Sequence, residues 1–125
     1  MLSNILASIN FLKSLGIFHR DIKPNNLILT FSEDDGFFVK LIDFSCAIRL
    51  EPEKRSYSRG WAGTHGYIPS YIYIYIYDHK VYTEEDLNSA DIYAACISIL
   101  TLANFDFNPY FDSKPQKHDQ ERLVQ

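Results

Sequence analysis

The sequence predicts an α+β domain that is mainly helical and carries short antiparallel β-hairpins. Two observations lead to this prediction. Apolar residues recur at helical spacing over residues 3–15, and a run rich in Ala, Ile and Leu over residues 90–103 has the composition of a buried helix. Between these segments lie short apolar runs separated by polar turns, which is the pattern of brief strands. A chain of 125 residues is long enough for one domain.

The first half of the chain alternates between one helix and several short strands. The helix over residues 3–15 places Ile5, Ile9 and Leu12 on one face, and Gly16 ends it. The expected strands cover residues 17–18, 27–29 and 37–42, and the polar turn over residues 32–36 joins the last two into a hairpin.

The second half begins with a long polar loop, expected over residues 51–66. The segment Tyr71 to Tyr77 alternates strictly between Tyr and Ile, which by its period is typical of a strand. A low-complexity stretch has the same appearance, so its conformation stays open. Helix-start signals at residues 83–86 precede the helix over residues 90–103, which is shorter than the roughly 18–20 apolar residues that span a bilayer.

Composition and charge exclude several classes of protein. A net charge of −4 without large basic clusters argues against a nucleic-acid partner, and no segment predicts a membrane span. Cys46 and Cys96 lie far apart with no metal-like spacing, so we expect reduced thiols rather than a disulfide or a zinc site. The start of the chain lacks the features of a secretory signal, and we expect an intracellular, cytoplasmic protein.

The segment His19–Asn26 carries the chemistry. It reads His-Arg-Asp-Ile-Lys-Pro-Asn-Asn and places a carboxylate, Asp21, five residues before a carboxamide, Asn26, on a loop between two expected strands. The segment resembles the catalytic loop of eukaryotic-type protein kinases, H-R-D-x-x-x-x-N, and matches it at every fixed position. The Lys23 position is similar to the serine/threonine-specific branch of that family.

The resemblance implies a role for each of these side chains. Asp21 would orient the substrate hydroxyl or accept its proton, Lys23 would neutralise the transferring phosphate, and Asn26 would hold Mg²⁺. Asp43-Phe44-Ser45 follows an apolar strand where the family has D-F-G, so Asp43 would be the second Mg²⁺ ligand and Phe44 a structural support. Ser45 replaces a glycine that reaches positive φ freely, so the flexibility of this turn is open.

Two later segments extend the resemblance. Gly63-Thr64-His65-Gly66-Tyr67 is similar to the G-T-x-x-Y of the substrate groove, so Thr64 would hydrogen-bond near Asp21 and Lys23. The A-P-E triplet that follows in the family is replaced by Pro69-Ser70-Tyr71, without the glutamate. Asp91 resembles the aspartate that opens the central helix and receives backbone N–H bonds from the catalytic loop around His19 and Arg20.

Arg20, directly before the proposed catalytic aspartate, implies a loop that phosphorylation can order, because arginine pairs well with phosphate. The candidate acceptors are Ser56, Tyr57 and Ser58, which could equally be ordinary loop hydroxyls. His19 is expected to be a packing residue rather than a base, and Trp61 a loop anchor.

The resemblance covers residues 3–109, and we expect a partial kinase domain over residues 1–110 followed by a polar tail over 111–125. The 125 residues contain no glycine-rich phosphate loop and no V-A-I-K lysine. The expected fold is therefore the large lobe (C-lobe) of a kinase, with the small lobe (N-lobe) absent.

The function implied is ATP- and Mg²⁺-dependent phosphoryl transfer to protein hydroxyls by a serine/threonine protein kinase whose activity without the small lobe is open. The partners would be a protein substrate and either another kinase or a separate N-lobe. The alternative is a catalytically inactive kinase-like binding module, a decoy or regulator of a kinase. A decayed or wrongly bounded gene product is the third reading, to which the Tyr-Ile repeat lends weight.

Overall fold

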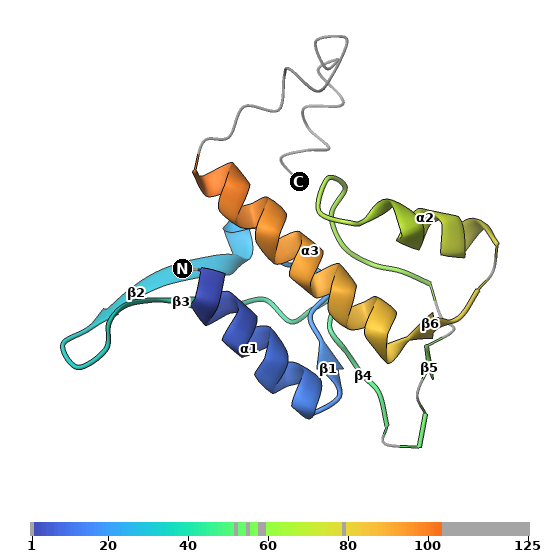
Figure 1. The fold of residues 1–125 in the computed structure, drawn as a ribbon, viewed down its shortest axis with the longest axis horizontal. Helices are drawn as coiled ribbons and strands as arrows, with labels where there is room; N and C mark the ends of the chain where they lie inside the picture. The colour runs from blue at the N-terminus through green and yellow to red at the C-terminus, as the bar shows by residue number, and fades with distance from the viewer. Residues whose placement is uncertain (1, 52, 55, 58–59, 79, 104–125) are drawn as a thin grey trace, which may run out of the picture.

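A computed structural model describes residues 2–51, 53–54, 56–57, 60–78 and 80–103. Within these residues the chain forms three α-helices and three two-stranded antiparallel sheets. Helix α3 runs through the middle of the molecule with α1 beside it, and the β2–β3 hairpin and α2 extend to opposite sides (Figure 1). The predicted mainly helical α+β fold with short antiparallel pairs is confirmed at this level.

Helix α1 covers Leu2–Ser14 and is stopped by Gly16, whose φ of +73° is accessible to glycine at little cost. A side chain at Gly16 would also place its Cβ 2.6 Å from the carbonyl oxygen of Leu50. The Leu50 N–H donates to the Gly16 carbonyl at 2.7 Å, and strand β1 (Ile17–Phe18) pairs with β4 (Ile48–Arg49) beside it. The turn after α1 thereby fixes where the next loop begins.

The predicted hairpin is present with nearly the expected bounds. A single 3-10 turn, η1 (Pro24–Asn26), leads into β2 (Leu27–Ser32), which pairs with β3 (Gly36–Leu41). The register starts at Leu27 opposite Leu41 and runs to the turn. The two ends of this hairpin therefore bring residue 26 and residue 42 side by side.

The long polar segment over residues 51–66 is not wholly a loop. Strand β5 (Ser56–Tyr57) lies within it and pairs with β6 (Tyr82–Thr83), with Tyr57 opposite Tyr82. The local sequence gives no strand signal there because the pairing partner lies about 25 residues later. Contact between the Tyr57 and Tyr82 rings, with centroids 6.4 Å apart, accompanies the pairing.

The Tyr-Ile repeat forms a helix, α2 (Ser70–Tyr77), so the strand indicated by its period is wrong. Ile72 is fully buried, and the rings of Tyr71 and Tyr75 meet at 5.9 Å, a contact that helical i, i+4 spacing allows. The Tyr71 hydroxyl donates to the Asp86 carbonyl at 2.9 Å, and burial raises the pKa of Tyr71 to about 12. Tertiary contacts therefore override the two-residue period.

Helix α3 (Glu84–Leu102) starts where the helix-start signals predicted. Thr83 and Asp86 form a capping box, in which the Thr83 hydroxyl accepts from the Asp86 N–H and the Asp86 carboxylate accepts from the Thr83 N–H. The expectation of a buried helix holds for one face only, because Ile92 and Leu102 stay partly exposed. Within the residues described, none of the helices has the length and hydropathy that crossing a membrane requires.

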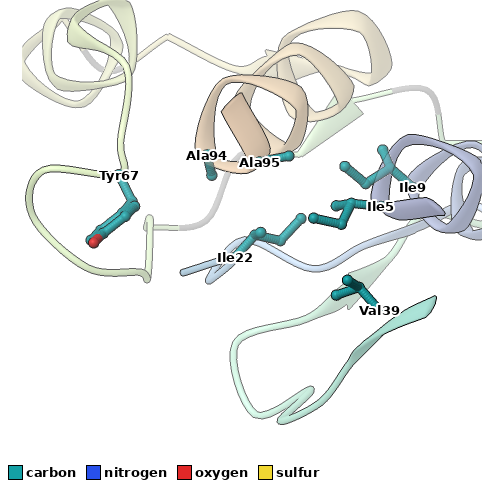
Figure 2. Packing of buried hydrophobic residues seen from close by; sticks show 7 residues of the cluster. All are labelled: Ile5, Ile9, Ile22, Val39, Tyr67, Ala94 and Ala95. Carbon is teal, nitrogen blue, oxygen red and sulfur yellow. The ribbon is translucent and has the colours of Figure 1, made fainter. Parts of the chain in front are cut away.

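Two apolar clusters lie against α3. The larger one brings together seven buried residues from α1, β3, α3 and the loops between elements: Ile5, Ile9, Ile22, Val39, Tyr67, Ala94 and Ala95. Figure 2 shows Ile22 extending toward Ile5, with the two alanines of α3 on one side and Val39 on the other. Because Ile22 is fully buried, the residue next to Asp21 is anchored in the core.

Candidate active site

Asp91, two turns into α3, fixes the backbone of the loop that is expected to be catalytic. Its Oδ2 accepts the N–H of His19 and its Oδ1 accepts the N–H of Arg20, both at 2.9 Å. Burial raises the pKa of Asp91, and the two N–H groups oppose this by stabilising the charged form. The two bonds expected of this aspartate are therefore present, on a carboxylate that is almost fully buried.

His19 joins the loop to the end of the hairpin through both ring nitrogens. Its Nε2 lies 2.9 Å from the carbonyl oxygen of Ile42, and its Nδ1 lies 3.1 Å from the backbone nitrogen of Asp21. A carbonyl only accepts and an amide only donates, so the partners assign the proton to Nε2 of a neutral ring. With both nitrogens engaged and the ring fully buried, His19 supports the loop rather than acting as a base.

Asp21, Thr64 and Lys23 form a hydrogen-bonded triangle. The Thr64 hydroxyl donates to Oδ1 of Asp21 at 2.7 Å and accepts from Nζ of Lys23 at 3.0 Å. The Lys23 ammonium also lies 3.9 Å from Oδ2 of Asp21, and the two charged side chains are only 18% and 11% exposed for the lysine and the aspartate. One hydroxyl therefore sets the distance between a carboxylate and an ammonium group.

Asn26 closes the loop on Asp21 from the other side. Its Nδ2 donates to the backbone carbonyl of Asp21 at 2.8 Å and lies 3.3 Å from Oδ2 of the same residue. Its own backbone carbonyl accepts the N–H of Ile42 at 2.9 Å. Both side-chain contacts use the amide nitrogen of Asn26, and neither uses its amide oxygen.

Gly63 brings the Thr64 segment against the catalytic loop. Its φ is +136°, and a Cβ at this position would lie 2.6 Å from the carbonyl oxygen of Arg20. A glycine is therefore required both by the backbone conformation and by the close approach. This position explains why the sequence has glycine directly before Thr64.

Asp43 is held less firmly than the other expected site residues. Its side chain is exposed and accepts the Ser45 N–H at 3.2 Å; within the described residues no hydrogen bond joins it to Asp21 or Asn26. Hydrogen bonding from Ser45, first through its side chain and then through its backbone, lowers the pKa of Asp43. The ring of Phe44 meets the His19 ring edge-on at 4.9 Å, which gives this turn a contact with the loop.

The backbone of this turn bears on the question that the Gly-to-Ser replacement at position 45 left open. The residue with positive φ is Asp43, at +58°, and Ser45 is not among the positive-φ residues of the described chain. Serine at position 45 is therefore not strained in this conformation. The left-handed conformation falls instead on an aspartate, one of the residues that tolerate it best.

The residues present fit a magnesium ion. Within the described residues no group of three or more His, Cys, Asp or Glu side chains forms a metal site. Mg²⁺, however, is commonly bound through one or two carboxylates together with substrate phosphates. An ionised, exposed Asp43 and the oxygen of Asn26 are hard oxygen donors on neighbouring ends of the hairpin, so they suit that kind of shared coordination.

Two of the three candidate phosphorylation sites lie within the described residues, on β5. Ser56 is exposed on β5 and Tyr57 is half-buried beside it, while Ser58 lies outside the described residues, as does the tail over 111–125. The structure adds a contact for the segment that replaces the family's A-P-E triplet. Tyr71 stands at the position of the family's A-P-E glutamate and meets the Asp86 carbonyl as a neutral hydroxyl.

The site thus consists of a loop held by a buried aspartate and, on that loop, an Asp-Lys pair bridged by Thr64. In a comparison with known proteins, the model of the protein kinase domain matches residues 1–125. The chain is 33% identical over 124 residues to the calcium/calmodulin-dependent protein kinase type II subunit delta of Oryctolagus cuniculus. It is 35% identical over 123 residues to the type II alpha chain of Drosophila melanogaster.

The chain therefore belongs to the eukaryotic-type serine/threonine protein kinase family. The alignments cover 99% and 98% of this chain but only 20% of each relative. The chain thus spans about a fifth of the length of these curated relatives.

Proposed function

We propose that this chain carries the catalytic loop of a serine/threonine protein kinase that transfers the γ-phosphoryl group of ATP to protein hydroxyls. The observation that carries the proposal is the triangle of Asp21, Thr64 and Lys23, with its hydrogen bonds of 2.7 and 3.0 Å. It places a proton acceptor and a positive charge at fixed positions on one nearly rigid loop. Phosphoryl transfer needs little more from a protein than such positioning and charge compensation.

Each side chain has a distinct task in this proposal. Asp21 orients the incoming serine or threonine hydroxyl and takes its proton on a carboxylate oxygen, since two of its lone-pair sites already serve Thr64 and Asn26 and others are open. Lys23 compensates the negative charge of the phosphoryl group. Asn26 and Asp43 would hold Mg²⁺, which when bound neutralises charge between the phosphates.

The proposal includes the division into lobes. We propose that residues 1–110 belong to the large lobe, and these 125 residues contain neither the lysine nor the glycine-rich loop that clamps ATP in the family. Full activity then requires a kinase small lobe, whether it is part of the same protein, separate or provided by another kinase, in addition to the protein substrate. An intracellular place of action is part of the proposal, and the free thiols of Cys46 and Cys96 suit it.

The test compares peptides that differ only in the acceptor hydroxyl. The chain, alone and with a separately prepared kinase small lobe, is incubated with Mg-ATP and peptides carrying Ser, Thr or Tyr. We expect transfer to Ser and Thr peptides, lost on chelation of Mg²⁺ and reduced about 10²- to 10⁴-fold by Asp21→Asn. Lys40→Met, on the far side of the hairpin, is the matched control that retains activity.

Two results would overturn the proposal. One is that no phosphoryl transfer occurs, whether the chain is alone or combined with the small lobe. The other is that transfer persists in Asp21→Asn. If instead a cellular effect of the chain survives in the Asp21→Asn, Asp43→Ala double variant, catalysis is not its function. The chain would then be the kinase-like binding module named above.

A further inference from the structure

The Arg20 side chain contacts two backbone carbonyls and two aromatic rings. Its Nε donates to the Cys46 carbonyl at 2.7 Å, and its Nη1 lies 3.3 Å from the carbonyl oxygen of Gly60. Its guanidinium carbon lies 5.2 Å from the ring centroid of Tyr57 and 5.6 Å from that of Trp61. Both distances fall within the roughly 6 Å over which a cation is attracted to a ring face.

The two rings that flank Arg20 are themselves anchored to the core. Trp61 lies 5.0 Å from the ring of Tyr82, which is buried and stands opposite Tyr57 in the β5–β6 pair. The indole Nε1 of Trp61 is buried without a hydrogen-bond partner in the described part of the chain. The position of Trp61 is therefore set by ring contacts rather than by its polar atom.

Arg20, which these two rings contact, is the sequence neighbour of Asp21, the proposed catalytic residue. Arg20 precedes Asp21, its backbone takes the strained φ of +67°, and its N–H is bound by Asp91. A left-handed conformation at a bulky residue persists only where the surroundings enforce it. The side-chain contacts and the Asp91 bond fix this residue from two directions.

We propose that Tyr57 and Trp61 are positioning residues that form an aromatic clamp on Arg20 and so set the position of Asp21 without phosphorylation. The clamp consists of these two rings and the guanidinium between them. It takes the place of the phosphate expected from the sequence, because a weakly hydrated planar guanidinium stacks on ring faces as readily as it pairs with an anion. The consequence for Asp21 rests on the proposed function; the clamp itself does not.

The first experiment measures the clamp without reference to catalysis. Trp61 is the single tryptophan of the chain, so its fluorescence quenching by acrylamide reports on this site alone. We expect Arg20→Met and Tyr57→Leu to raise the quenching constant by about two- to fivefold. A cation–π contact at a partly exposed site shifts the equilibrium between the packed and the open ring by about that factor. Tyr57→Phe, which keeps the ring face, should leave it unchanged.

Two controls separate the clamp from general unfolding and from phosphate. Lys40 lies 5.5 Å from the Phe38 ring on the hairpin, so Lys40→Met removes a cation–ring pair elsewhere and should not change Trp61 quenching. Phosphatase treatment of the purified chain should also leave quenching unchanged. Unchanged quenching in Arg20→Met, or a rise after phosphatase treatment, would overturn the clamp.

The second experiment tests the positioning of Asp21, once transfer by the unaltered chain is established. We expect Trp61→Leu to lower kcat by about tenfold or more, as small misplacements of catalytic groups do, while KM for ATP stays within about twofold. Trp61→Phe should restore kcat because it keeps an aromatic face and removes the unpaired N–H. Equal loss in Trp61→Phe and Trp61→Leu, or a change confined to KM, would contradict the positioning role whatever the quenching result.

Discussion

The loop that carries Asp21 and the turn that carries Asp43 are held very differently, although both are expected to serve one phosphoryl group. Asp21 is bonded to Thr64 and Asn26, and its loop is fixed by the buried Asp91. Asp43 is exposed and its hydrogen bonds come from Ser45, two residues away. The difference indicates that folding preorganises the first carboxylate, whereas the second is free to adjust to a ligand.

Replacing the buried Asp91 should have the largest effect on this comparison. Asp91→Ala leaves the N–H groups of His19 and Arg20 without their acceptor in a buried site, and we expect a loss of about 3–5 kcal/mol in the free energy of unfolding. Urea denaturation gives this value, and amide hydrogen exchange at His19 and Arg20 locates it. Asp91→Asn keeps one acceptor oxygen, so its free energy of unfolding should lie between those of Asp91→Ala and the unaltered chain.

One outcome for Asp91→Ala would contradict the difference between the Asp21 loop and the Asp43 turn. If Asp91→Ala unfolds at the same urea concentration as the unaltered chain, the catalytic loop is not held by folding. Its rigidity would then be no greater than that of the Asp43 turn.

Removing the bridging hydroxyl should have the next largest effect. Thr64→Val keeps the shape of the side chain but deprives Asp21 of a donor and Lys23 of an acceptor, at a cost of about 1.5–3 kcal/mol for a hydrogen bond to a charged group. Thr64→Ser keeps the hydroxyl and serves as the control. Thermal unfolding of the two variants checks the prediction, and equal stabilities would contradict it.

The stability of the Asp43 turn should depend on backbone conformation rather than on a bridging hydrogen bond. Because its φ is +58°, Asp43→Gly should be more stable than Asp43→Ala by about 1–2 kcal/mol, the cost of a left-handed conformation for an ordinary residue. Ser45→Gly is the matched control and should bring no such gain, since the positive φ is not at that residue. The opposite order of Gly and Ala in urea denaturation would show that the turn relaxes.

The smallest effect concerns the pKa values of the two unlike carboxylates. Burial raises the pKa of Asp91 above its ordinary 3.8, whereas hydrogen bonds from Ser45 lower the pKa of Asp43 below it. The stability contribution of Asp91 is thus complete below pH 3.8 and declines as the pH rises through its folded pKa. That of Asp43 is present above 3.8 and declines as the pH falls through its folded pKa.

Titration of the side-chain carboxyl carbons by NMR resolves the two groups. Ser45→Ala should raise the pKa of Asp43 toward its ordinary value and leave Asp91 unchanged. If both carboxyl groups titrate with the same pKa, the predicted difference between Asp91 and Asp43 is wrong.

Much of the catalytic loop could be predicted because its motif is contiguous. His19–Asn26 matches the family pattern at every fixed position, and the contacts expected of Thr64 and Asp91 are present in the structure. The hairpin turn and the capping box at Thr83 were equally local signals. Each depends on residues only a few positions apart.

The features that escaped prediction depend on distant residues. The helix at 70–77 is stabilised by contacts of Tyr71 with Asp86 and of Tyr75 with Tyr82, so its own alternation suggested the wrong element. The two rings that contact Arg20 lie four positions apart, and the ring that both of them contact, Tyr82, comes about 20 residues later. Only the fold brings Tyr57, Trp61 and Tyr82 together, and no spacing in the sequence indicates that they meet.

The composition of helix α2 affects what this protein does when it is heated. Its seven residues of alternating Tyr and Ile are uncharged and of high β-propensity, which is the composition of segments that stack between molecules into cross-β fibrils. Tyr77 is 85% and Ile74 55% exposed even in the helix, so the tertiary contacts of Tyr71, Ile72 and Tyr75 restrain the segment. We expect heating to release α2 first and to end in concentration-dependent aggregation rather than reversible unfolding.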